Sequence, residues 1–219
     1  MKVKKQFSAN LRSLILSLAI ISMMITLTNA YIAVYNVQKK LITDQILSSN
    51  LNYSSKLAAT TESFLSSAQQ ELAYSATWIA NNFSNDNVLL EKSEQAYHMS
   101  QSFNSIFVAD DQNRIRAVYP ASLNLRGSTL ASDASKLALT EQRPLISQPY
   151  VSMTGNLLVL VSSPIKDKQG NYLGYIGGTI YLKSKSVLNE FMNTHFYNDY
   201  SSVYVIDKNG IVLYHQDKQ

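Results

Sequence analysis

The hydrophobic and polar positions of this chain form three successive patterns. Residues 14–34 (LILSLAIISMMITLTNAYIAV) are predominantly apolar, and no charged residue occurs between Arg12 and Lys39. Residues 36–83 place apolar or small side chains three or four positions apart, the period of one helical face. Beyond residue 100, short apolar runs bounded by polar turns are typical of strands. The helical stripe consists of Leu57, Thr61, Leu65, Ala68, Leu72, Ala76, Ile79 and Phe83.

The apolar segment is long enough to cross a membrane, because a transmembrane helix needs roughly 20 such residues. Four basic residues and no acid precede it, and Lys39 and Lys40 follow it. The positive-inside rule therefore predicts a cytoplasmic tail at 1–13, a transmembrane helix at 14–34 and an exported remainder. We expect a single-pass protein of the cell (inner) membrane. Two alternatives stay open: a cleaved signal peptide ending near Thr28-Asn29-Ala30, or a buried helix of a soluble domain.

The helical stripe predicts a long stalk helix over residues 36–82. About 45 helical residues span roughly 70 Å, and a helix of that length needs a packing partner. The candidates are its own domain and the same helix of a second subunit, so we expect a homodimer formed through the stalk. The stripe is weak between residues 36 and 55, where Ser and Asn are frequent.

Glycine and proline separate a helical half from a sheet half. All seven Gly and all four Pro lie within residues 120–219, and both residue types end helices and mark turns. A turn at Asn81–Asn87 precedes a second helix at Val88–Ser100. Antiparallel hairpins that follow a long helix predict an α+β fold. The expected elements are strands at Ser105–Ala109, Ile115–Tyr119, Leu157–Ser163 and Tyr172–Leu182, with a short helix near Ala131–Thr140.

The last residues of the sequence read as a hairpin. Strands are expected at 203–206 and Ile211–Tyr214, with the turn signal Asn209-Gly210 between them. The segment VYVIDKNGIVLYH (203–215) resembles IFVADDQNRIRAVY (106–119), a weak internal repeat with a period near 97 residues. A linker helix at Lys185–Asn193 would join the two copies. We therefore expect residues 183–219 to begin a second, incomplete domain.

Charge and composition exclude several functions. The formal charge of +4 arises from residues 1–12, because the rest of the chain balances 15 basic against 15 acidic residues. A nucleic-acid partner is not expected, since that would require a basic patch on the folded part. The absence of cysteine excludes disulfides and thiolate sites. His98, His195 and His215 stand alone, so we expect no metal, no cofactor and no catalytic residues.

Several motifs in the second half resemble the double Cache family of bacterial sensors. They are RPLISQPYV (143–151), VSSPI (161–165), DKQG (167–170) and LGYIGGTI (173–180), which follow a membrane helix and a stalk in that order. The family forms the extracytoplasmic region of chemoreceptors, histidine kinases and diguanylate cyclases. The resemblance covers about residues 14–219 and implies a PAS-like antiparallel sheet domain.

The resemblance assigns ligand binding to a membrane-distal Cache domain at residues 83–182. A smaller proximal domain, a second membrane helix and a cytoplasmic output domain would follow. No Gly-Gly-Asp-Glu-Phe stretch occurs, so this chain is not expected to be an enzyme. A diguanylate cyclase or chemoreceptor output would lie beyond residue 219, and the sequence looks like a fragment or a truncated product. The alternative is a membrane-anchored periplasmic interaction domain without a small-molecule ligand.

A small ligand of unknown identity needs fixed polar groups in a concave site. Arginine offers a bidentate fork to a carboxylate. The candidate ligand-binding residues are Arg116, Tyr119, Arg126, Tyr150, Ser152, Thr179 and Tyr181. Each also has a structural alternative, because strand arginines can be solvated, a loop arginine can lie at the surface, and strand tyrosines can serve packing.

One departure from the family pattern concerns amino acids. Members that bind amino acids carry an Arg-x-Trp-Tyr cluster before the LIS strand and an Asp in the last strand. Here Trp78 is the only Trp and lies on the stalk, residues 123–141 hold no such cluster, and Thr179 stands where the Asp is expected. The resemblance therefore does not carry an amino-acid ligand over to this chain. Either the ligand is of another kind, or the domain senses no small molecule.

Overall fold

The computed structural model describes residues 10–182, 204–206, 210 and 212–215. The chain divides into two compact units, residues 1–60 and 61–219. It combines a long apolar helix with an antiparallel sheet domain, which confirms the α+β class predicted from the sequence.

Helix α1 runs from Leu11 to Ala80 without interruption. Every side chain from residue 10 to residue 56 is exposed, and the helix is long and apolar enough to cross a membrane, with a mean hydropathy of 1.9 over its most apolar window. The hydroxyls of Ser17, Ser22, Thr26 and Thr28 donate to carbonyls three or four residues earlier, at 2.7–3.0 Å. These bonds satisfy the polar groups within the helix, which a hydrocarbon environment requires.

In the second unit, the end of α1 contributes the buried side chains Ala68, Leu72, Ala76 and Ile79. Helix α2 follows at Asp86–Met99. It begins two residues before the expected Val88, because the Asn85 side chain accepts hydrogen bonds from the backbone N–H groups of Asn87 and Val88. Such an N-cap satisfies donors that the first helical turn leaves without a partner.

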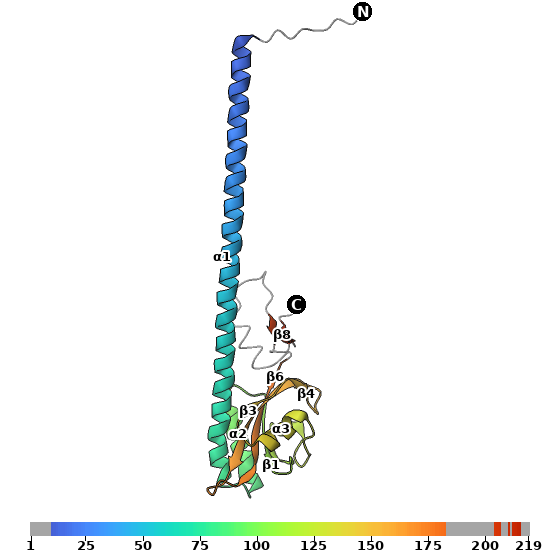
Figure 1. The fold of residues 1–219 in the computed structure, drawn as a ribbon. Coiled ribbons are helices and arrows are strands. Elements are labelled where there is room, and N and C mark those ends of the chain that lie inside the picture. Colours follow the sequence, from blue (N-terminus) through green and yellow to red (C-terminus); the bar gives the residue numbers. More distant parts are fainter. Residues whose placement is uncertain (1–9, 183–203, 207–209, 211, 216–219) are drawn as a thin grey trace, which may run out of the picture. The chain divides into compact units, whose positions relative to one another are not determined.

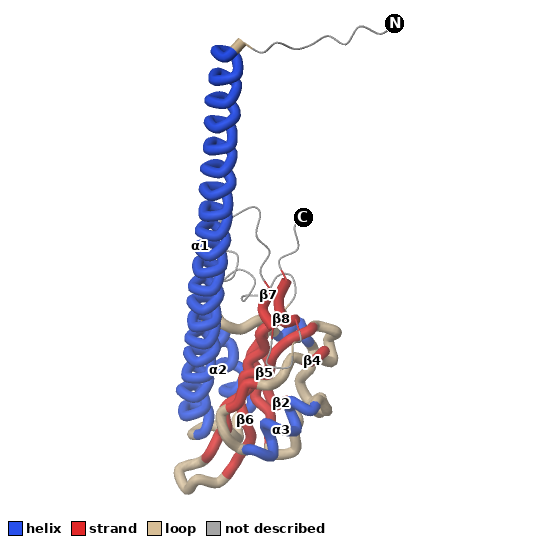
Figure 2. The backbone as a smooth tube through the Cα atoms, turned by 45° about the horizontal axis from the view of Figure 1, so that its top comes forward, coloured by secondary structure: helices blue, strands red, loops and turns tan. Residues whose placement is uncertain are grey.

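The main sheet is antiparallel, with strand order β2-β1-β6-β5-β3, and β4 also pairs with β5. Figure 2 draws the strands in red. The two longest strands, β5 and β6, form the hairpin expected around Asp167–Asn171. The strands are β1 Ser105–Asp110, β2 Ile115–Tyr119, β3 Leu145–Ile146, β4 Tyr150–Val151, β5 Leu157–Lys166 and β6 Tyr172–Tyr181.

Strand β5 extends past its expected end at Ser163 and includes Pro164. Proline lacks a backbone donor and is tolerated where a strand lies at an edge. The pairing of β3 with β5 begins at Leu145↔Ser162, so Pro164 needs a partner strand only on the β6 side, where it lies opposite Tyr175.

Helices lie on opposite faces of the sheet (Figure 1). Helix α2 packs against β1 and β2, whereas α3 (Asp133–Glu141) packs against β5 and β6 on the other face. The α3 face carries a core cluster that includes Phe107, Leu160 and Tyr175. The 3-10 helix η1 (Ala121–Leu123) lies in the segment between β2 and α3. Residues 121–132, which lie between β2 and α3, are here called the cavity loop.

Strands β7 (Tyr204–Ile206) and β8 (Val212–His215) form a second antiparallel pair. Their register shifts between Val205 and Ile206, and the β1–β2 register shifts between Val108 and Ala109. The two shifts lie 97 residues apart, which equals the period of the expected repeat. The predicted linker helix at 185–193 lies outside the described residues.

Candidate functional site

A small cavity lies on the α3 face of the sheet, with a volume of about 60 Å³. Residues of β1, β2, β5 and β6 line it on one side, and the cavity loop, Tyr150 of β4 and the turn after β4 line it on the other. The loop contributes Leu123, Leu125 and Leu130, which also pack against the core cluster. The site is therefore a mainly apolar, partly open hollow between the sheet and an irregular segment.

Hydroxyl groups provide most of the polar lining. Ser105 on β1 and Thr179 on β6 are both buried, and their hydroxyl oxygens are 2.6 Å apart. These residues lie directly opposite each other in the β1–β6 register, which explains the contact. In the turn after β4, the hydroxyls of Ser152 and Thr154 are 2.8 Å apart.

Two tyrosines complete the polar lining. Burial raises the pKa of Tyr150, against a hydrogen bond with Ser132 that lowers it. Burial also raises the pKa of Tyr181, and a hydrogen bond with Asn156 again acts in the opposite direction. Both phenols therefore stay protonated at neutral pH and can donate as well as accept hydrogen bonds.

Four of the seven residues expected to bind ligand line this cavity. They are Tyr150, Ser152, Thr179 and Tyr181, which come from β4, the turn after it and β6. Their role in binding stays a prediction, but the fold brings them together although up to 31 residues separate them in sequence.

Arg116, Tyr119 and Arg126 do not line the cavity. The Arg116 guanidinium donates to Asp86 Oδ1 through Nε at 2.9 Å and Nη2 at 2.5 Å, and Arg126 Nη2 lies 3.0 Å from Asp86 Oδ2. Arg116 also lies over the ring of Phe83, 5.5 Å from its centroid. Tyr119 lies beside α2, where its hydroxyl is 3.1 Å from His98 Nε2.

A β-bulge explains where Arg116 lies. Val108 pairs with Ala117 and Ala109 pairs with Ile115, so Arg116 has no direct partner on β1. A bulge re-aims side chains relative to strict alternation, and here it allows Arg116 to reach Asp86 at the start of α2. Together the two arginines hold the pKa of Asp86 below its ordinary value of 3.8, although burial acts in the opposite direction.

Sequence reasoning missed several lining residues. Ser105 and Phe107 alternate on β1 and both face the cavity, which period-two alternation could have shown. Ser132 is the N-cap of α3, where its side chain accepts a hydrogen bond from Ser135 N. A serine before a helical pattern is a recognisable start signal, but nothing in the sequence placed that helix beside β6.

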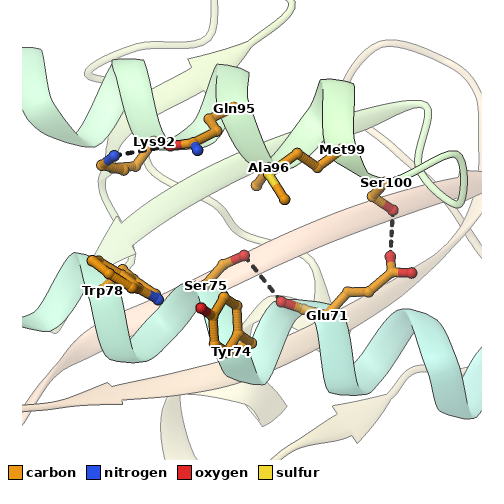
Figure 3. A pocket seen from close by; sticks show the side chains of 9 residues that line it. All are labelled: Glu71, Tyr74, Ser75, Trp78, Lys92, Gln95, Ala96, Met99 and Ser100. Atoms are coloured by element: carbon orange, nitrogen blue, oxygen red, sulfur yellow. Dashed lines mark hydrogen bonds between the residues drawn. The ribbon is translucent and has the colours of Figure 1, made fainter.

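A larger groove of about 290 Å³ lies between α1 and α2 within the second unit. Figure 3 shows Glu71, Tyr74, Ser75 and Trp78 on one helix opposite the α2 side chains. Ser100 donates a 2.5 Å hydrogen bond to Glu71 Oε2 across it, and Lys92 Nζ donates to Gln95 Oε1 at 2.8 Å. Three of its side chains are largely exposed apolar groups: Tyr74, Trp78 and Met99.

Within the part of the chain that the structure describes, no group of three or more His, Cys, Asp or Glu side chains could hold a metal ion. The cavity lining offers hydroxyl and apolar groups only. Its chemistry therefore favours non-covalent recognition by hydrogen bonds and packing.

Comparison with known proteins gives the family. The family model dCache_1, described as "Cache domain", matches residues 34–219. The chain belongs to the Cache domain family. A search of curated proteins gives no significant match for this Cache domain chain.

Solved structures support the same fold. The ligand-binding domain of Pseudomonas fluorescens chemoreceptor CtaA in complex with L-serine is 18% identical, with a TM-score of 0.56, over 76% of this chain and 72% of that one. The ligand-binding domain of the Pseudomonas aeruginosa PAO1 amino acid chemoreceptor PctC, in complex with GABA, is 18% identical, with a TM-score of 0.57. That match covers 76% of this chain and 74% of that one. The sensor domain of the V. cholerae histidine kinase DctB is 16% identical, with a TM-score of 0.55. That match covers 81% of this chain and 68% of that one.

A longer structural neighbour shows that similar folds occur within larger chains. The extracellular ligand binding receptor from Desulfohalobium retbaense DSM5692 is 15% identical, with a TM-score of 0.54. The match covers 69% of this chain but 30% of that receptor. These identities indicate a shared fold and do not transfer a ligand.

Proposed function

We propose that this chain is the extracytoplasmic, ligand-sensing region of a membrane-anchored signal-transduction protein. Cache domains serve as ligand-binding sensor domains of chemoreceptors and histidine kinases. The observation that carries the proposal is the cavity on the α3 face, where hydroxyls from separate elements converge. A concave, mainly apolar lining with a few convergent polar groups is the usual property of a small-molecule site.

The proposed organisation follows the sequence. Residues 1–13 form a cytoplasmic tail, 14–34 the membrane span, 36–82 the stalk, 83–182 the distal sensor domain, and 183–219 the start of a proximal domain. The output, such as a diguanylate cyclase or a chemotaxis signalling domain, would lie beyond residue 219. This Cache chain itself would be no enzyme.

The proposed mechanism is a population shift. A ligand that fits the cavity would favour one arrangement of the cavity loop and the sheet relative to the helices. Because α1 continues directly from the domain into the apolar segment, that arrangement would bias the position of the stalk. Small displacements of a packed helix are an established way to transmit such a change.

Thermal unfolding of the full chain in lipid nanodiscs, with and without members of a metabolite panel, tests the proposal. A ligand that binds the folded state raises the unfolding temperature as its concentration rises. Thr179→Val should reduce that increase, whereas Thr140→Val should not, because Thr140 is exposed and its hydroxyl bonds only within α3. No increase with any compound of a broad panel would contradict small-molecule sensing.

A second candidate function, homodimerisation, is favoured by the groove between α1 and α2. Tyr74, Trp78 and Met99 are 64%, 55% and 74% exposed there, and large aromatic residues dominate protein interfaces. Glu71 and Lys92 carry opposite charges in the same groove, so two copies related by a two-fold axis could pair Glu71 of one with Lys92 of the other. We propose a second copy of this chain as the occupant.

Native mass spectrometry of the chain in detergent tests the dimer. Trp78→Ala should shift the population toward the monomer. Leu137→Ala is the matched control, because Leu137 is also an exposed apolar helix residue, on α3. A Trp78→Ala dimer population equal to that of the unaltered chain would exclude this groove as the interface.

A further inference from the structure

The cavity is lined without a single charged side chain. Its sixteen lining residues, all within the described part of the chain, include no Asp, Glu, Lys, Arg or His. The polar members are hydroxyl groups, and the remainder are apolar or small. A buried ionic ligand needs a paired charge, because an uncompensated charge in a low-dielectric site is costly.

Four charged residues border the lining in sequence. Arg114 is exposed, and Arg116 pairs with Asp86. The other two are also held away from the cavity. Arg126 follows Leu125 of the lining, but its guanidinium pairs with Asp86 at 3.0 Å. Asp133 follows Ser132 of the lining, but its side chain is fully exposed and lies 3.5 Å from Lys136 Nζ. Neither group supplies a counter-charge to the cavity.

The α3 N-terminus does not substitute for a cation. Helix N-termini bind anions through backbone N–H groups that lack partners. Here Ser132 accepts from Ser135 N at 3.2 Å through its side chain and from Lys136 N at 3.0 Å through its carbonyl. Asp133 in the first turn adds a negative charge, which also disfavours an anion there.

The hydroxyls suit a neutral partner. In the Ser105–Thr179 pair either oxygen can be the donor, so one hydroxyl proton of the pair remains for another acceptor. Tyr150 and Tyr181 can likewise donate or accept. The volume of about 60 Å³ corresponds to roughly two to five water-sized groups.

We propose that the cavity binds a small, uncharged molecule that carries hydroxyl, carbonyl or amide groups on a short apolar skeleton. This inference rests on the proposed sensor function and names the class of ligand for the same site. It excludes free amino acids, carboxylates and amines as ligands of this cavity.

Two pairs of probes of nearly equal size isolate the effect of charge. Propane-1,2-diol is neutral and 1-aminopropan-2-ol is its cationic counterpart, while lactamide is neutral and lactate is its anionic counterpart. Binding of each to the full chain in phosphatidylcholine nanodiscs is measured by calorimetry at neutral pH. A neutral lipid keeps the bilayer from attracting or repelling the charged probes.

The neutral member of at least one pair should bind at least about tenfold more tightly than its charged counterpart. Tyr181→Phe and Thr179→Val should each weaken that binding roughly two- to tenfold, the usual effect of one lost hydrogen bond. Thr140→Val on the exposed face of α3 is the matched control and should leave it unchanged. Tyr181→Phe keeps the test valid if Thr179→Val lowers the stability of the fold.

The outcomes separate this inference from the sensor function. Tighter binding of lactate or 1-aminopropan-2-ol, weakened by Tyr181→Phe, would overturn the neutral class and leave small-molecule sensing intact. If neither neutral probe binds while a charged compound of the metabolite panel stabilises the chain, the neutral-ligand inference is likewise overturned. Failure of every compound in both experiments would overturn both proposals.

Discussion

Gly177 and Gly178 in β6 allow aromatic rings to pack directly on the sheet backbone. A Cβ atom on Gly177 would lie 2.4 Å from Cζ of Phe107, and one on Gly178 would lie 2.4 Å from Cδ1 of Phe103. Because successive strand residues face opposite sides, the two glycines make room on both faces. Phe107 also lines the cavity, so Gly177 affects the shape of the candidate site.

Gly177→Ala should therefore destabilise the fold by about 1–3 kcal/mol, the usual effect of overpacking a dense core. Urea denaturation of the full chain measures this change. Combining Gly177→Ala with Phe107→Leu removes the ring that the new methyl group contacts. The loss of unfolding free energy in the double variant should be smaller than the sum of the losses in the two single variants. If it is not smaller, the close contact is not the cause.

Asp86 should make stability depend on pH. Its folded-state pKa is lowered, so its contribution is present above the unfolded value near 3.8 and is lost as pH falls through the folded value. At neutral pH, Asp86→Asn should cost no more than about 1 kcal/mol, because the carboxylate is partly exposed. The difference from the unaltered chain should disappear at pH values below the folded pKa.

Denaturation of both proteins across the acid range checks this expectation. Asp133→Asn is the control, since that carboxylate is fully exposed and its replacement should change stability by less than about 0.5 kcal/mol. A difference between Asp86→Asn and the unaltered chain that persists unchanged at low pH would contradict the ion-pair explanation.

At the scale of elements, α2 depends on its first turn. The Asn85 side chain accepts from Asn87 N at 3.1 Å and Val88 N at 3.4 Å. Asn85→Ala should cost about 1 kcal/mol of stability, measured by thermal denaturation. Asn87→Ala is the control, because Asn87 is exposed and takes part in the cap through its backbone. Equal losses for both variants would show that the cap is not responsible.

Elements were more predictable than the site. The strands at Ser105 and Ile115, the β5–β6 hairpin and the long helix follow from local periodicity and turn residues, which the structure bears out. The ion pair between Arg116 and Asp86 could not be predicted from the sequence. Arg116 is the unpaired residue of a bulge in β2, and the bulge changes which groups its side chain reaches. Alternation assumes an unbroken ladder, and a bulge breaks that assumption without a clear sequence signal.

The same reasoning limits the prediction of the cavity. Tyr150, Ser152, Thr179 and Tyr181 were identified as candidates, but their convergence depends on β4 pairing with β5 and on β5 pairing with β6. Leu123, Leu125 and Leu130 enter the lining from an irregular loop. Loop conformation depends on tertiary contacts that periodicity does not record.

At the scale of the whole molecule, the exposed apolar segment favours a membrane span. Leu14, Ile20 and Ile25 are 48–58% exposed in the structure. Full burial of such a side chain contributes about 1.5–3 kcal/mol, so each half-exposed one forgoes roughly half of that in water. Lipid removes that cost along the segment. We therefore expect the chain to be integral to the bilayer, and the positive-inside rule predicts that residues 1–13 lie in the cytoplasm.

Single cysteines test this orientation, because the chain contains no cysteine of its own. In intact cells a membrane-impermeant maleimide should label Lys168→Cys, an exposed position in the β5–β6 turn, but should label Ser8→Cys only after permeabilisation. Labelling of Ser8→Cys, but not of Lys168→Cys, in intact cells would show that the chain has the opposite orientation in the membrane. Loss of the segment that carries Ser8→Cys from the mature protein would establish the cleaved signal peptide. A sensor of external ligands requires that Lys168→Cys be labelled in intact cells and Ser8→Cys only after permeabilisation, because the cavity must face the compartment in which the ligand occurs.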